Sequence, residues 1–342
     1  MHKTLLAAIA FMYSSAVLAQ TDSSAIYLQK ALNEKTKGRK MEVVKALEKA
    51  LTFNKANKQV VSELAYAYVD VRMPAKAREY FLQLENMGGA TTDIYKQLMS
   101  LHYNMRQFGD AIRYAQLVKK SDASEKTAFV IGRSYYEMDD LGNSTRFLEI
   151  AAKEEPSNAQ IPHLLATAYT NMQNFKLAIP NFKKAIALEP ANARYIYEMA
   201  LAYYGMGDDQ NALKYMLEAG EKGYKKDSEY MQNLSTALLN AGKFSDGLEI
   251  MKESLAKRPS DIGLIDMLAE ACYDAGKYDD AINFYNKILA IDDTKAEALY
   301  MMGMAYQKKG KVENGRALCD KAIAMDPKLS NLKQEKKMPG GF

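Results

Sequence analysis

The chain has 342 residues, of which 48% are hydrophobic and 26% are charged, so it is long and apolar enough to bury a sizeable core. The 46 Lys and Arg residues nearly balance the 42 Asp and Glu residues, which argues against a dedicated nucleic-acid-binding protein. Nineteen glycines and only two cysteines exclude collagen-like and disulfide-dense scaffolds.

Residues 1–19 have the pattern of a secretory signal peptide. Lys3 supplies a positive charge, an apolar run follows from Leu5, and the small residues Val17 and Ala19 occupy the −3 and −1 sites before polar sequence begins at Gln20. We therefore expect cleavage after Ala19, the alternative being an uncleaved amphipathic first helix. The apolar run is short for a membrane span, and we expect no transmembrane segment in the mature chain.

A period of about 34 residues runs through residues 24–329 and predicts nine repeats. Each repeat contains two helical patterns that are joined near its fifteenth residue, so each is expected to be a helix-turn-helix unit. Prolines near the end of several repeats are expected to stop the second helix. The repeats start at Ser24, Lys58, Thr92, Glu125, Ala159, Ala193, Ser228, Ile262 and Ala296, the joining glycines are Gly38, Gly207, Gly242, Gly276 and Gly310, and the prolines are Pro156, Pro190, Pro259 and Pro327.

Small residues recur at two positions of the repeat, which predicts close contact between its two helices. The eighth residue is small in eight of nine repeats, as in Ala31, Ala65 and Gly132, and so is the twentieth, as in Ala77, Ala111 and Gly315. Large apolar residues and tyrosines lie on the same helical faces. A single helix pair cannot bury these faces, whereas a stack of pairs can.

The pattern of these residues resembles that of the tetratricopeptide repeat (TPR) family, in its exported bacterial form. The resemblance covers nearly the whole mature chain. The first repeat departs from the pattern, because Lys30 and Glu34 replace usual apolar residues, as a solvent-facing cap would. The resemblance implies an all-α fold, a right-handed α-solenoid of about nine repeats. It also implies a concave groove, lined by the first helices, that holds peptides or partner proteins.

The residues that would line this groove include many tyrosines. A tyrosine ring offers a large contact area at little entropic cost, and its hydroxyl can bind a peptide backbone. The alternative is that these rings are common fillers of the repeat, half-buried against their neighbours. The candidate groove residues are Tyr66, Lys96, Tyr103, Phe129, Arg133, Tyr136, His163, Asn171, Arg194, Tyr197, Tyr204, Tyr273 and Tyr300.

The carboxylate clamp of chaperone-binding members is incomplete in this chain. That clamp needs Lys at the fifth and Asn at the ninth residue of one repeat, and here Lys96 is followed by Ser100. We therefore do not expect recognition of the acidic tail of a cytosolic chaperone.

No catalytic or metal-binding arrangement is evident. Three histidines cannot form a metal cluster or a triad by their spacing, and His102 is expected to be a satisfied structural histidine in the core. Cys272 and Cys319 lie on helices that should not be neighbours, so we expect two buried thiols rather than a disulfide. Neither a metal nor another cofactor is expected.

Residues 330–342 are too short for a long solvating helix. Leu329 and Leu332 are expected to form a short cap, the alternative being that the edge of the ninth repeat is exposed for docking or self-association.

The sequence thus predicts a non-enzymatic, exported scaffold, periplasmic or associated with the outer membrane. It would bind a protein or peptide in its groove and organise a cell-envelope complex, with no nucleic-acid partner. The alternative is a glycan-facing or enzyme-accessory binding protein, since tyrosine rings also stack on sugars.

Overall fold

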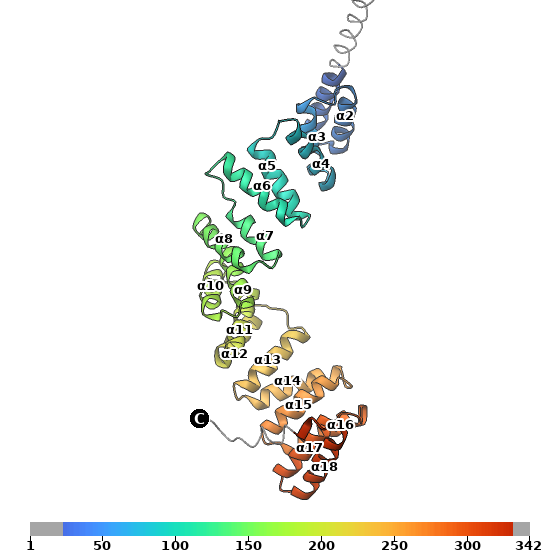
Figure 1. The fold of residues 1–342 in the computed structure, drawn as a ribbon, viewed down its shortest axis with the longest axis vertical. Coiled ribbons are helices and arrows are strands. Elements are labelled where there is room, and N and C mark those ends of the chain that lie inside the picture. The colour runs from blue at the N-terminus through green and yellow to red at the C-terminus, as the bar shows by residue number, and fades with distance from the viewer. Residues whose placement is uncertain (1–22, 331–342) are drawn as a thin grey trace, which may run out of the picture. The chain divides into compact units, whose positions relative to one another are not determined.

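The computed structural model describes residues 23–330, and the regular structure in this range is entirely helical. Eighteen helices form successive helix-turn-helix pairs (Figure 1), which confirms the expected all-α solenoid of about nine repeats. None of the described helices combines the length and the hydropathy that a bilayer crossing needs. The predicted signal peptide, 1–19, lies outside the described residues, as does most of the tail.

The described residues fall into two compact units that divide between Met172 and Gln173. The first unit contains a helix over 23–36, followed by α2 (Lys40–Phe53), α3 (Lys58–Asp70), α4 (Pro74–Asn86), α5 (Thr92–Asn104), α6 (Phe108–Ser121), α7 (Ala128–Glu137), α8 (Leu141–Glu154) and α9 (Gln160–Asn171). The second unit contains α10 (Phe175–Leu188), α11 (Ala193–Gly205), α12 (Asp209–Glu221), α13 (Ser228–Asn240), α14 (Phe244–Lys257), α15 (Ile262–Asp274), α16 (Tyr278–Ile291), α17 (Ala296–Lys308) and α18 (Val312–Met325).

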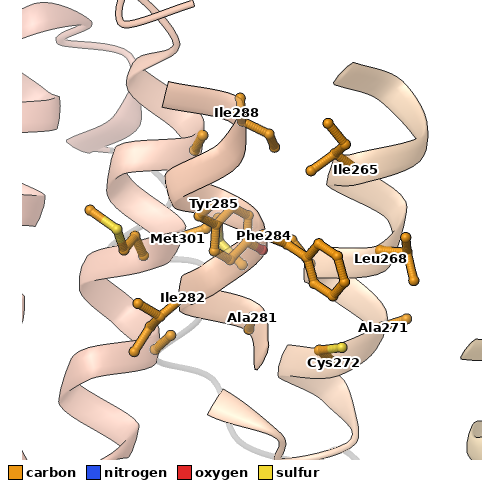
Figure 2. Packing of buried hydrophobic residues seen from close by; sticks show 14 of the residues in the cluster. Ile265, Leu268, Ala271, Cys272, Ala281, Ile282, Phe284, Tyr285, Ile288 and Met301 are labelled. Carbon is orange, nitrogen blue, oxygen red and sulfur yellow. The ribbon is translucent and has the colours of Figure 1, made fainter. Parts of the chain in front are cut away.

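Within each unit, every helix packs against the next one in the chain. The contacts run from α2 to α9 in the first unit and from α10 to α18 in the second. The core of each unit is therefore assembled from sequence neighbours, as expected for a repeat protein. Figure 2 shows this arrangement in the second unit, where side chains of α15, α16 and α17, among them Leu268, Phe284, Tyr285 and Met301, share one buried layer.

The turn inside each repeat has one conformation throughout. Its fifteenth residue adopts a positive φ in all nine repeats: in five it is the glycine expected from the sequence, and in four it is Arg72, Arg106, Asp139 or Gln173, with φ between 56° and 60°. In most of them the next residue donates its backbone N–H to the carbonyl five residues earlier, as Met73 does to Tyr68 at 2.9 Å. This is the hydrogen-bond pattern of a Schellman cap, and it turns the chain into the second helix.

The two helices of a repeat touch at the small residues. A Cβ atom added to Gly303 of α17 would lie 2.7 Å from the carbonyl oxygen of Gly315 in α18, and one added to Gly315 would lie 2.5 Å from that of Gly303. In the fourth repeat a Cβ on Gly132 would lie 2.8 Å from Leu148 Cγ. The expected close approach is confirmed, because side chains larger than these cannot fit without moving a helix.

The fourth repeat has a shortened first helix. It was expected to start at Glu125, but α7 begins at Ala128 and has 10 residues, whereas α5 has 13. The preceding segment forms a local turn in which Asp122 Oδ1 accepts hydrogen bonds from the Ser124 backbone and hydroxyl, at 2.8 and 2.6 Å. Asp and Ser side chains that bond the nearby backbone compete with helix formation, which accounts for the missing turn.

The second helices that precede the expected prolines end two residues before them: α8, α10, α14 and α18 end at Glu154, Leu188, Lys257 and Met325. Leu329 is buried in the core of the second unit, where a further helical turn begins. It takes the position expected of a cap, whereas Leu332 lies outside the described residues.

The positive φ of the turn residue predicts opposite changes in stability for two substitutions. Replacing the exposed Arg72 by Gly relieves a left-handed backbone and should stabilise the fold by about 0.5–1 kcal/mol, while Gly276→Arg should destabilise it by about 1–2 kcal/mol. A Cβ at Gly276 would meet nothing within 4 Å, so the effect isolates the backbone strain. Urea unfolding of the two variants measures both, and changes of the same sign in the two variants would contradict the assignment.

Candidate functional site

The first helices of the first unit bring four candidate groove residues together in two pairs. The guanidinium of Arg133 (α7) lies 4.9 Å from the ring centroid of Tyr103 (α5), and Asn171 (α9) donates an amide hydrogen to the hydroxyl of Tyr136 (α7) at 3.3 Å. Tyr103 and Tyr136 are half-buried. Burial raises the pKa of Tyr103, so its hydroxyl remains protonated and able to donate at neutral pH. These two pairs on the first helices offer cationic, amide and phenolic groups side by side.

The other candidates of this unit have structural partners. Lys96 forms an ion pair with Glu125, and its ammonium lies 3.9 Å from Asp93. Tyr66 packs edge-on against buried Phe81, with ring centroids 5.1 Å apart, and half-buried Phe129 packs on the core near Ala128. His163 is half-buried on α9.

In the second unit the candidate tyrosines divide into buried and exposed rings. Tyr197 and Tyr300 are only 3% and 1% exposed, so they contribute to packing and offer no surface to a partner. Tyr273 is half-buried with its ring edge against Tyr278, and Tyr204 is 43% exposed. Arg194 is exposed, and its Nε lies 2.6 Å from Glu198 Oε1.

Tyr204 lines a pocket of about 240 Å³ between the first helices of three successive repeats. Leu201 and Tyr204 come from α11, and Met267 comes from α15. Polar groups face them from α13. The full lining is Leu201, Tyr204, Met216, Gln232, Asn233, Thr236 and Met267.

The polar side of the pocket is held in place by the buried tyrosine. Asn233 donates its amide hydrogen to Tyr197 Oη at 2.7 Å, and the ring of Tyr197 stacks on Tyr224 with centroids 4.1 Å apart. The amide of Gln232 lies 3.7 Å from the sulfur of Met267, across to the next repeat. Tyr197 therefore orients a lining residue although its own ring is inaccessible. The pocket offers an aromatic ring and flexible apolar chains for contact, together with fixed amides for hydrogen bonding.

Sequence reasoning found part of this pocket. Tyr204 is a candidate groove residue, and in the TPR family the groove is lined by the second, fifth, ninth, twelfth and thirteenth residues of each repeat, positions that Leu201, Gln232 and Thr236 occupy here. Asn233 and Met267 were missed, because both are the sixth residue of their repeat, which lies outside that pattern.

The side chains that could take part in catalysis or metal binding occupy structural positions. Among the described residues no group of three or more His, Cys, Asp or Glu side chains could hold a metal ion. No disulfide joins Cys272 and Cys319 in this part of the chain, and both are buried, as predicted. His102 is buried, as predicted, and stacks on Tyr114 with centroids 5.2 Å apart. It is not satisfied, since neither ring nitrogen has a hydrogen-bond partner of good geometry within the described residues.

Family models identify the repeats directly. A model described as "Tetratricopeptide repeat" matches residues 159–192 and 296–329, and one described as "TPR repeat" matches residues 269–310. These segments are thus TPR repeats, and proteins built from such repeats are generally non-enzymatic binding scaffolds.

The chain is also similar to individual proteins. It is 25% identical over 164 residues to the human (Homo sapiens) General transcription factor 3C polypeptide 3, which covers 44% of this chain and 18% of that protein. Among solved structures it is similar to YrrB, titled "a TPR protein with an unusual peptide-binding site", at 19% identity and a TM-score of 0.45, covering 56% of this chain and 98% of that one. It is likewise similar to PilF of Pseudomonas aeruginosa, at 19% identity and a TM-score of 0.43, covering 64% and 99% of the two chains.

The environment of His102 predicts a pH-dependent stability. Burial is the largest influence and lowers its pKa, Arg78 and Arg113 act in the same direction, and Asp110, 3.7 Å from Nδ1, and the side chain of Gln107 oppose them. The unfolded chain therefore binds a proton at a higher pH than the folded one does, so stability is present above the usual histidine pKa and falls as the pH drops below it.

Urea unfolding at pH 7.5 and pH 5 measures this effect. His102→Leu should reduce the loss of stability at pH 5 relative to the unmodified protein measured in parallel. An unchanged pH dependence in His102→Leu would contradict the assignment.

Proposed function

We propose that this chain is an exported, non-enzymatic scaffold that binds an extended segment of a partner protein along its first helices. The observation that carries the proposal is the pocket between α11, α13 and α15, which combines the exposed ring of Tyr204 with the amides of Gln232 and Asn233. Aromatic and Met side chains are enriched where proteins bind one another, and the amides match the hydrogen-bonding groups of a peptide backbone.

The dimensions of the pocket favour a peptide side chain over a larger ligand. Sites for drug-sized molecules generally have ~300–1,000 Å³, whereas this pocket has about 240 Å³. One bulky apolar side chain of a partner would enter it while the flanking backbone runs along the first helices. The Tyr103–Arg133 and Tyr136–Asn171 pairs provide comparable polar contacts in the first unit.

Export is proposed from residues 1–19. Their charge, short apolar run and small residues at the cleavage site support a signal peptide. An exported scaffold would then act in the periplasm or at the outer membrane, where it would organise an envelope complex.

Peptide selection tests the binding proposal. The protein is recovered from the envelope of the producing cells, and a displayed library of random 12-residue peptides is selected on it. The intact mass of the recovered protein also reports whether residues 1–19 have been removed. Selected peptides should share one bulky apolar residue and bind Tyr204→Ala at least about tenfold more weakly, because the ring supplies a central contact.

Met206→Ala is the matched control, since Met206 is equally exposed, at 43%, two residues from Tyr204 and outside the pocket lining. It should bind like the unmodified protein. If no peptides are enriched, or if those enriched bind Tyr204→Ala unchanged, the proposal fails. Binding of oligosaccharides through Tyr204, insensitive to salt, would instead support the glycan-facing alternative.

A further inference from the structure

A second cleft, of about 420 Å³, opens in the first unit between α6 and α8. Its apolar lining runs from the core to the surface, because Ile131 of α7 is buried whereas Ile150 of α8 is 40% exposed. The full lining is Gln116, Lys119, Lys120, Thr127, Ala128, Ile131, Phe147, Ile150 and Glu154. These residues lie mainly on second helices, so the cleft is separate from the candidate groove residues.

The cleft lies beside the shortened start of α7. Residues 125–127 precede the helix, and Thr127, which is only 3% exposed, contributes to the lining. Two interactions hold the opening in shape: Lys119 donates to the backbone oxygen of Glu125 at 2.8 Å, and the Ala128 backbone N–H donates to Glu154 Oε2 at 3.4 Å. These hydrogen bonds give the cleft of the fourth repeat a defined shape.

Cations outnumber carboxylates within the cleft lining and α8. Lys119 and Lys120 lie in the lining and Arg146 and Lys153 on the exposed surface of α8, whereas the carboxylates of these elements are Glu149 and Glu154. Glu154 pairs with Lys119 at 3.1 Å, and the guanidinium of Arg146 lies 5.2 Å from the ring centroid of Phe147. Lys120, Arg146 and Lys153 are exposed.

We propose that this cleft is a second docking site, which binds a partner polypeptide presenting a bulky apolar side chain flanked by Asp or Glu. The apolar side chain would cover Ile131, Phe147 and Ile150, and the carboxylates would meet Lys120, Arg146 and Lys153. Apolar anchors in a pocket supply most of the affinity of such contacts, and complementary charges at the rim supply orientation and specificity.

Methyl NMR of the full chain with labelled isoleucine δ1 groups tests the site. The probe is a synthetic 12-residue peptide with Leu at positions 4 and 8 between Glu residues. Its titration should shift the methyl signals of Ile131 and Ile150. A peptide with Ala in place of both Leu residues should cause no shift, and one with Lys in place of every Glu should bind at least about tenfold more weakly.

Two matched variants control for surface hydrophobicity. Ile150→Glu should abolish the shift of Ile131, whereas Ile291→Glu, which changes an isoleucine of similar exposure (46%) at the end of α16, should leave it unchanged. Circular dichroism verifies that both variants are folded. Shifts confined to other methyl groups, or equal affinity for the Lys peptide, would overturn the proposal. Tyr204→Ala should not affect this site, so its outcome is distinguishable from that of the groove.

Discussion

The two helices of a repeat approach so closely that, at several positions, a single Cβ atom would collide with the facing backbone. Gly303 and Gly315 show the constraint most directly, because each faces the carbonyl oxygen of the other. Gly247 is similar, since a Cβ there would lie 2.9 Å from the carbonyl oxygen of Ser235. This contact fixes the helix pair, and the left-handed residue before the second helix fixes the direction of the turn.

The location of the binding residues follows from the fixed arrangement of the two helices in each repeat. Once the helices of a repeat are locked together, successive pairs stack through contacts between sequence neighbours, and each first helix presents one face beside the next. Tyr204, Gln232 and Met267 belong to three different repeats and meet in one pocket for this reason. The second cleft lies in the fourth repeat, beside the start of the shortened α7.

The repeat pattern predicted most of the architecture from sequence, since a period set by small residues, glycines and prolines is a strong local signal. The individual site residues were less predictable. Tyr197 and Tyr300 occupy groove positions but are buried, because at these positions the rings turn toward neighbouring side chains, as Tyr197 does toward Tyr224. Met267 was missed because the sixth residue of the repeat is not a groove position of the family pattern, although here it lines the pocket. The turn at Asp122 shortened α7 through local hydrogen bonds that no periodicity reveals.

Close helix contact within a repeat positions the binding face, and hydrogen exchange of a Gly247→Val variant measures whether that contact is required. The added side chain should push α13 and α14 apart, so amide protection should fall in those two helices while it is retained in the first unit. Gly109→Val is the control, because a Cβ there meets nothing within 4 Å. Unchanged protection of α13 and α14 in Gly247→Val would contradict the account.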